Sequence, residues 1–83
     1  LLLSGNSIGD DGVVALAGNP HLRRLEALDL GGNDFGDKGA RALLDSPHLG
    51  KLKNLNVGGN QVGPTVSAQL AERFEMSVTD EVP

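Results

Sequence analysis

The sequence predicts an α/β chain built from tandem repeats, and two observations carry this prediction. Asn6, Asn33 and Asn60 stand 27 residues apart (33 − 6 and 60 − 33), and similar residue types recur around each of them. Self-similarity at one fixed period is typical of stacked repeat units. Within each unit, hydrophobic residues also alternate between the spacing of a strand and the spacing of a helix. The chain should therefore hold about three units of strand, turn and helix, the first one truncated.

The middle unit shows both spacings most clearly. Leu28 and Leu30 are two residues apart, so their side chains should fall on one face of a strand. Ala40, Leu43 and Leu44 follow the i, i+3, i+4 spacing of one helix face. Because a helix separates each strand from the next, we expect neighbouring strands to pair in parallel.

The start of each helix is predicted from residues that favour capping. Asp37 and Asp10 occupy the same place in successive repeats, and each is expected to cap the first turn of its own helix. Pro64 fills this place in the third repeat, where it is compatible with the first helical position. The third helix is therefore expected to run from Pro64 to Phe74.

These residues resemble a known family. The consensus L-x-x-L-x-L-x-x-N-x-L of leucine-rich repeats is similar to Leu25-x-x-Leu28-x-Leu30-x-x-Asn33-x-Phe35 and to Leu52-x-x-Leu55-x-Val57-x-x-Asn60-x-Val62, and Leu1-x-Leu3-x-x-Asn6-x-Ile8 is a truncated third copy. The Gly-Asp-x-Gly-Ala-x-Ala-Leu segment from Gly36 is similar to the ribonuclease-inhibitor-like branch. The Asn-Pro-His-Leu and Ser-Pro-His-Leu joins resemble bacterial members.

The resemblance implies a short right-handed solenoid, with parallel strands on the concave side and helices on the convex side. It also implies a structural ladder in which Asn6, Asn33 and Asn60 bond to the backbone at the bend after each strand. We expect the repeat array to cover residues 1–75 and a C-terminal tail to cover residues 76–83, with at most one short strand in the tail.

The two ends of the array differ in their expected cover. Solenoid repeats bury their apolar faces against neighbours, so the first unit should lack cover on its outer side. The residues concerned are Leu1, Leu3, Ile8, Val13 and Leu16. We expect either upstream repeats of a longer protein or a dimer contact at this edge. At the other end, Phe74 is the bulkiest residue available to close the last layer.

Composition excludes several functions. The formal net charge is −4 and the seven basic residues are scattered along the chain, which argues against nucleic-acid binding. The absence of cysteine excludes disulfides and thiolate metal sites, and leaves the compartment undecided. No apolar run approaches the roughly 20 residues that span a bilayer, so no membrane contact is expected.

Candidate binding residues lie on the strand positions that should face the concave side. They are Ser4, Ala27, Asp29, Asn54 and Asn56, with Leu2, Gly31 and Gly58 beside them. Asp29 and Asn56 are the strongest candidates. None of these positions holds the Trp, Tyr or Arg that anchors many interfaces, so a solvated surface without a partner is the alternative.

Other sites are disfavoured by what the pattern lacks. His21 and His48 share one position of the repeat and should lie close together, but two ligands without a third make a poor zinc site. No nucleophile with a base, and no pair of carboxylates in an apolar pocket, is indicated. We therefore expect no enzyme activity, cofactor, metal or small-molecule substrate.

The sequence thus favours a non-catalytic protein-protein interaction module, forming the C-terminal part of a longer leucine-rich-repeat protein. Two alternatives stay open. One is a structural capping segment that binds nothing itself. The other, by analogy with the family, is a regulatory domain resembling GTPase activators.

Overall fold

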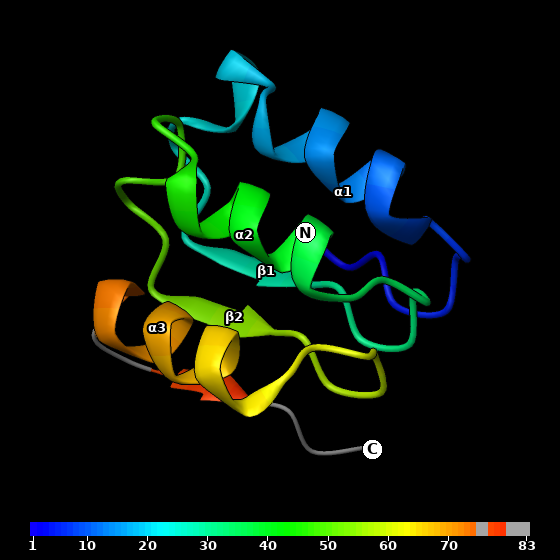
Figure 1. Ribbon diagram of the computed structural model, residues 1–83. Helices are drawn as coiled ribbons and strands as arrows, with labels where there is room; N and C mark the ends of the chain where they lie inside the picture. The colour runs from blue at the N-terminus through cyan, green and yellow to red at the C-terminus, as the bar shows by residue number, and fades with distance from the viewer. Residues whose placement is uncertain (75–76, 80–83) are drawn as a thin grey trace.

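The computed structural model describes residues 1–74 and 77–79, in which three α-helices lie side by side over one face of a parallel sheet (Figure 1). In chain order the elements are α1 (Gly9–Ala17), the 3-10 helix η1 (Pro20–Leu22), β1 (Ala27–Asp29), α2 (Asp37–Asp45), β2 (Asn54–Asn56), α3 (Pro64–Phe74) and β3 (Ser77–Thr79). The predicted alternation of strand and helix is therefore confirmed. The predicted bounds of the third helix are also confirmed.

The sheet has the order β1-β2-β3, and both pairs are parallel. Ala27 lies opposite Asn54, which repeats the period of 27 residues (54 − 27). Asn54 lies opposite Ser77, only 23 residues later (77 − 54). The last unit is shorter because α3 leads to β3 without a second helical turn like η1 between them. On the other side of β1, Leu2 forms a parallel bridge to Asp29 and extends the sheet by one short segment.

The core lies between the sheet and the helices. Its buried hydrophobic residues are Val13, Ala17, Leu28, Leu30, Phe35, Ala40, Leu43, Leu49, Leu52, Leu55, Val57, Val66, Leu70 and Phe74. Aliphatic side chains dominate this list, so the layer is held by many methyl contacts rather than by large rings. Phe35 is fully buried and fills the bend after β1.

The expectation that Val13 lacks cover was wrong, because this side chain is fully buried. Helix α2 covers it, and Gly39 permits the approach of the two helices. A Cβ atom on Gly39 would lie 3.1 Å from Val13 Cβ and 3.1 Å from Phe35 Cδ1. The first unit is instead exposed at Leu1 and Leu2, of which Leu2 is 80% accessible.

The expectation that Asp10 and Asp37 cap their own helices was also wrong. Both residues lie inside the first turn of their helices, whereas a capping residue must precede that turn. Asp10 Oδ1 instead accepts hydrogen bonds from the backbone N–H groups of Gly36 (3.0 Å) and Gly39 (2.7 Å), at the start of α2. Asp37 Oδ1 accepts from Gly63 N–H (2.7 Å), just before α3. Each aspartate therefore caps the helix of the following unit.

The other end of α2 is bonded by a side chain from α3. The Arg73 guanidinium donates to the backbone carbonyls of Leu43 (2.8 Å), Leu44 and Ser46. It also lies over the Phe74 ring, with Cζ 4.8 Å from the ring centroid. A cation at a helix C-terminus satisfies free carbonyls and complements the helix dipole. Helix α2 is thus capped at both ends by side chains of neighbouring units.

The pair Asp10 and Asp11 tests this capping. Asp10→Ala should lower the free energy of unfolding by about 1–2 kcal/mol, because two amides at the start of α2 lose their acceptor. Asp11→Ala is the control, since it removes the same charge from the next residue. Its side chain is 94% exposed and contacts only Lys38 among the described residues, so stability should change little. Urea denaturation of both variants measures the difference, and equal losses would contradict the capping role of Asp10.

Candidate functional site

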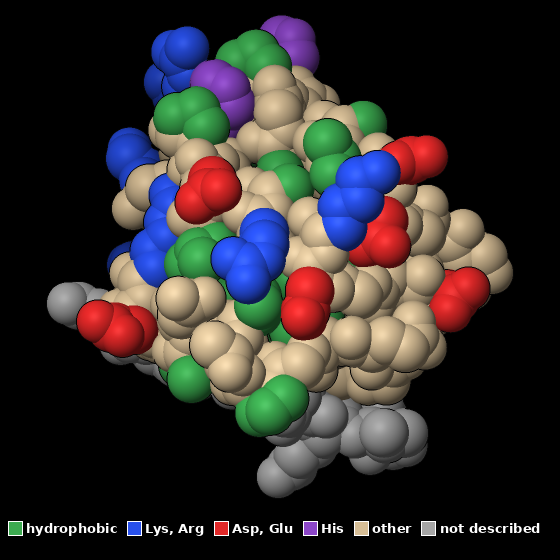
Figure 2. Space-filling model, viewed as in Figure 1, with side chains coloured by type: hydrophobic (Ala, Val, Ile, Leu, Met, Phe, Trp, Pro, Cys, Tyr) green, Lys and Arg blue, Asp and Glu red, His purple; other side chains and the backbone are tan. Residues whose placement is uncertain are grey.

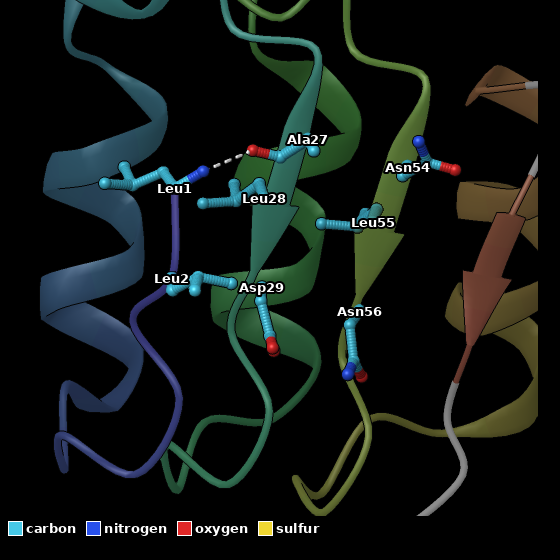
Figure 3. Close-up of a pocket in the computed structure, with 8 residues that line it drawn as sticks. All are labelled: Leu1, Leu2, Ala27, Leu28, Asp29, Asn54, Leu55 and Asn56. Atoms are coloured by element: carbon cyan, nitrogen blue, oxygen red, sulfur yellow. Dashed lines mark hydrogen bonds between the residues drawn. The ribbon is translucent and has the colours of Figure 1, made fainter.

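The open sheet face is the side of the sheet that the helices leave uncovered, and we define it by Leu2, Ala27, Asp29, Asn54 and Asn56 (Figure 3). Successive strand residues point to opposite sides, so these residues face away from the helices while Leu28 and Leu55 point into the core. A shallow, mainly apolar pocket crosses the face from the Leu1–Leu2 segment over β1 to β2. The face therefore brings together Ala27, Asp29, Asn54 and Asn56 from the predicted binding set.

Asp29 and Asn56, the strongest candidates from the sequence, are partly occupied by their own loops. Asp29 Oδ1 accepts from Gly31 N–H (2.9 Å), and Asn56 Oδ1 accepts from Gly58 N–H (2.8 Å). Each bond spans two residues and shapes the turn that follows the strand. The Asp-x-Gly and Asn-x-Gly spacing could have indicated this role. One carboxylate oxygen of Asp29 and the amide NH₂ of Asn56 remain directed to other partners.

The other candidates differ in their place on the face. Ala27 and Asn54 are exposed at the starts of β1 and β2, and within residues 1–74 the Asn54 side chain forms no hydrogen bond. Ser4 lies beyond the Leu1–Leu3 segment, in the turn after it, and is not among the residues that line the pocket. The face can therefore contact apolar groups near Leu2 and donate or accept hydrogen bonds at Asn54.

The asparagine side chains join neighbouring units through the backbone. Asn33 is fully buried, and its Oδ1 accepts from the N–H groups of Asn6 (2.9 Å) and Ile8 (3.3 Å) in the preceding unit. Its Nδ2 donates to the carbonyl of Leu3 (2.8 Å) in the same unit. Three polar groups of one bend are thus satisfied by one side chain from the next bend.

Asn60 repeats this arrangement, and Asn6 does not. Asn60 Oδ1 accepts from Asn33 N–H (2.7 Å) and Asn60 Nδ2 donates to Leu30 O (2.9 Å), both in the preceding unit. Asn6 Nδ2 donates only to nearby carbonyls, those of Leu3 (2.8 Å) and Ser4 (3.3 Å). The bonds between units therefore point from each asparagine back to the unit before it.

The described residues show no metal site or membrane helix. No group of three His, Cys, Asp or Glu side chains in residues 1–74 is placed to hold a metal ion, and this includes the surroundings of His21 and His48. Both histidines follow a capping side chain, since His21 N–H donates to Asn19 Oδ1 (2.9 Å) and His48 N–H donates to Ser46 Oγ (3.2 Å). Within the same part of the chain, the helices are too short and too polar to cross a bilayer.

Comparison with known proteins gives one match. The family model described as Leucine Rich repeat matches residues 1–17 and 18–44, which together cover 44 of the 83 residues (17 + 27). The boundary between the two matched segments agrees with the repeat spacing in the sheet. No curated protein and no solved structure matches the chain.

The three asparagines should differ in their contribution to stability. Asn33→Ala should cost about 2–4 kcal/mol, because it leaves several buried backbone groups without partners. Asn60→Ala should cost less, since Asn60 is only partly buried, and Asn6→Ala should cost least because its bonds are local and exposed. Thermal and urea denaturation of the three variants measures this order. Equal losses at Asn6 and Asn33 would contradict the assigned direction of the bonds.

Proposed function

Because this chain belongs to the leucine-rich-repeat family, whose repeats commonly mediate protein-protein interaction and are generally non-catalytic, we propose that it binds a protein partner through the open sheet face. The observation that supports this proposal is the pocket on that face, which is mainly apolar and spans three adjacent chain segments. Shallow apolar surface with a few polar groups suits contact with a protein segment. Enzyme activity forms no part of the proposal.

The chemistry of the face supports a division of roles. Leu2 and Ala27 supply apolar area, and Leu2 is among the most exposed hydrophobic residues of the described chain. Asn54 supplies an amide that can donate and accept, and Asp29 supplies a negative charge with one oxygen outside the Gly31 turn. A partner segment that fits this face carries small apolar side chains beside a hydrogen-bonding group. We place Asn56 and Ser4 at the edge of the contact.

We further propose that the sheet is the concave side of a right-handed solenoid and that residues 1–75 form one array. Support comes from the parallel strands joined through helices, since such crossovers are nearly always right-handed. A full helix in each unit supports assignment to the ribonuclease-inhibitor-like branch, and the Pro-His-Leu joins support likeness to bacterial members.

We also propose that the chain forms the C-terminal part of a longer array. The Leu1–Leu3 edge supports this: Leu2 is 80% exposed, α1 has no side-chain cap, and Asn6 Oδ1 accepts no hydrogen bond from residues 1–74. A further unit beside this edge would supply a carboxylate and backbone groups in the same way that α1 and α2 supply them to the units that follow. At the other end, the shortened last unit and the Arg73 bonds support a finished terminus.

An added unit tests the proposed continuation. Placing a second copy of residues 1–27 before Leu1 supplies a new aspartate and a new bend in register. The extended protein should unfold at a higher urea concentration, because the new unit buries the exposed edge. In that protein Asn6→Ala should cost about 2–4 kcal/mol, as at Asn33, because Asn6 then bonds to a preceding unit. An Asn6→Ala loss that stays as small as in the original chain would contradict the proposal.

Binding through the open sheet face is tested with two matched double variants. A partner is first identified by affinity capture with the 83-residue protein, and its Kd is then measured by calorimetry. Ala27→Arg with Asn54→Arg should weaken binding by at least about tenfold, because two long charged side chains cover the pocket. Ala15→Arg with Ala68→Arg adds the same charge to exposed helix positions and should leave Kd nearly unchanged.

Two results would overturn this assignment. If the face variant binds as the unmodified protein does, the partner uses another surface. If the 83-residue protein captures no specific partner, the chain acts as a structural capping segment only.

A further inference from the structure

We propose a second contact surface, separate from the open sheet face, that binds an acidic segment of a protein. This surface is a basic rim formed by Arg23, Arg24, Lys51 and Lys53, all of them exposed. They occupy the two loops that lead into β1 and β2. The expectation of scattered basic residues was therefore wrong for the folded chain, since four of the seven basic residues gather at one end of the sheet.

The two loops follow the same path, which explains the gathering. Leu25 N–H donates to Leu22 O (3.1 Å), and Leu52 N–H donates to Leu49 O (3.2 Å), so each loop contains the same turn. The turns are also linked, because Lys53 N–H donates to the carbonyl of Glu26 (2.7 Å).

Equivalent positions therefore lie next to each other across the two loops. Arg24 and Lys51 occupy one such position (51 − 24 = 27), and the strands that follow them are adjacent. Adjacent strands lie about 4.8 Å apart, so the basic side chains rise from neighbouring points. Figure 2 shows Lys and Arg side chains along the left edge, over these loops as placed in Figure 1.

Most of this positive charge has no partner within the described residues. Lys53 pairs with Glu26 at 3.3 Å, and both side chains are mostly exposed. Arg23, Arg24 and Lys51 form no ion pair within residues 1–74. Asp45, at the end of α2, is the other acidic residue near this end of the sheet. Close like charges repel, and an anionic ligand relieves that repulsion.

The opposite end of the sheet has the opposite charge. Asp10, Asp11, Asp34 and Asp37 lie in or just after the loops that leave the strands, where Lys38 is the basic residue. An acidic partner would be repelled there and attracted to the basic rim. The net charge of −4 therefore conceals a separation of charge between the two ends of the strands.

An acidic protein segment fits the rim better than a nucleic acid does. Unpaired bases bind largely by stacking on exposed aromatic rings, and Phe35 and Phe74 are both buried. The four cations also span only two neighbouring turns, whereas tight binding to a nucleic-acid backbone requires a longer basic stripe. Exposed pairs are individually weak and salt-sensitive, so the rim should mainly speed and orient association.

The test uses a fluorescent polyglutamate peptide of about ten residues, followed by anisotropy at low salt. The 83-residue protein should bind it, and binding should weaken steeply as ionic strength rises to about 0.15 M. Arg24→Glu with Lys51→Glu should raise Kd by about tenfold or more. Lys38→Glu with Arg41→Glu makes the same charge change on α2 and should change Kd by less than about threefold.

Further variants separate this surface from the open sheet face. Ala27→Arg with Asn54→Arg should not weaken binding of the peptide, whatever its effect on a protein partner. Arg24→Gln with Lys51→Gln should also weaken peptide binding, and it keeps the test decisive if the glutamate variant does not fold.

Four results would overturn the proposal. They are absence of peptide binding, equal weakening by the rim variant and the α2 variant, tighter binding of a single-stranded oligonucleotide of equal charge, and salt-sensitive self-association of the protein that the rim substitutions abolish.

Discussion

The fold depends on side chains that bond to the backbone of a neighbouring unit. Asn33 completes the bend before it, Asp10 caps the helix after it, and Arg73 closes the end of α2. Strands of three residues and helices of nine have little stability alone, since short isolated elements do not persist in water. The bonds between units supply what the elements lack individually. Burial of the aliphatic layer then fixes the units against one another.

This arrangement leaves two surfaces with few structural duties. The polar groups needed for folding lie in the bends and helix starts, so Ala27 and Asn54 on the open sheet face are available to a partner. The loops entering the strands hold Arg24 and Lys51, whose side chains form no ion pair within residues 1–74. A shallow apolar face beside a basic rim suits a partner that combines a small apolar segment with acidic residues. Apolar contact then contributes to affinity, and charge contributes to orientation and rate.

The period of the sequence predicted much of the fold and less of the site. Spacing alone identified the parallel units and the bounds of α3, because both follow from local pattern. The direction of the Asp10 bond was not predictable from a single unit, since it depends on how closely α1 and α2 approach at Gly39. The basic rim was also missed, because Arg24 and Lys51 become neighbours only through the sheet register. The shortened last unit breaks the period, so repetition could not predict the position of β3.

The opposite directions of the two kinds of bond have an evolutionary consequence. Asparagines reach back and aspartates reach forward, and both connect positions roughly one period apart. Tandem duplication or loss of a segment as long as one period keeps these positions in phase, wherever the breakpoints fall. A single-codon insertion inside a unit displaces donor from acceptor on both sides at once. Such a gene is expected to change length in whole periods and to vary by substitution in between.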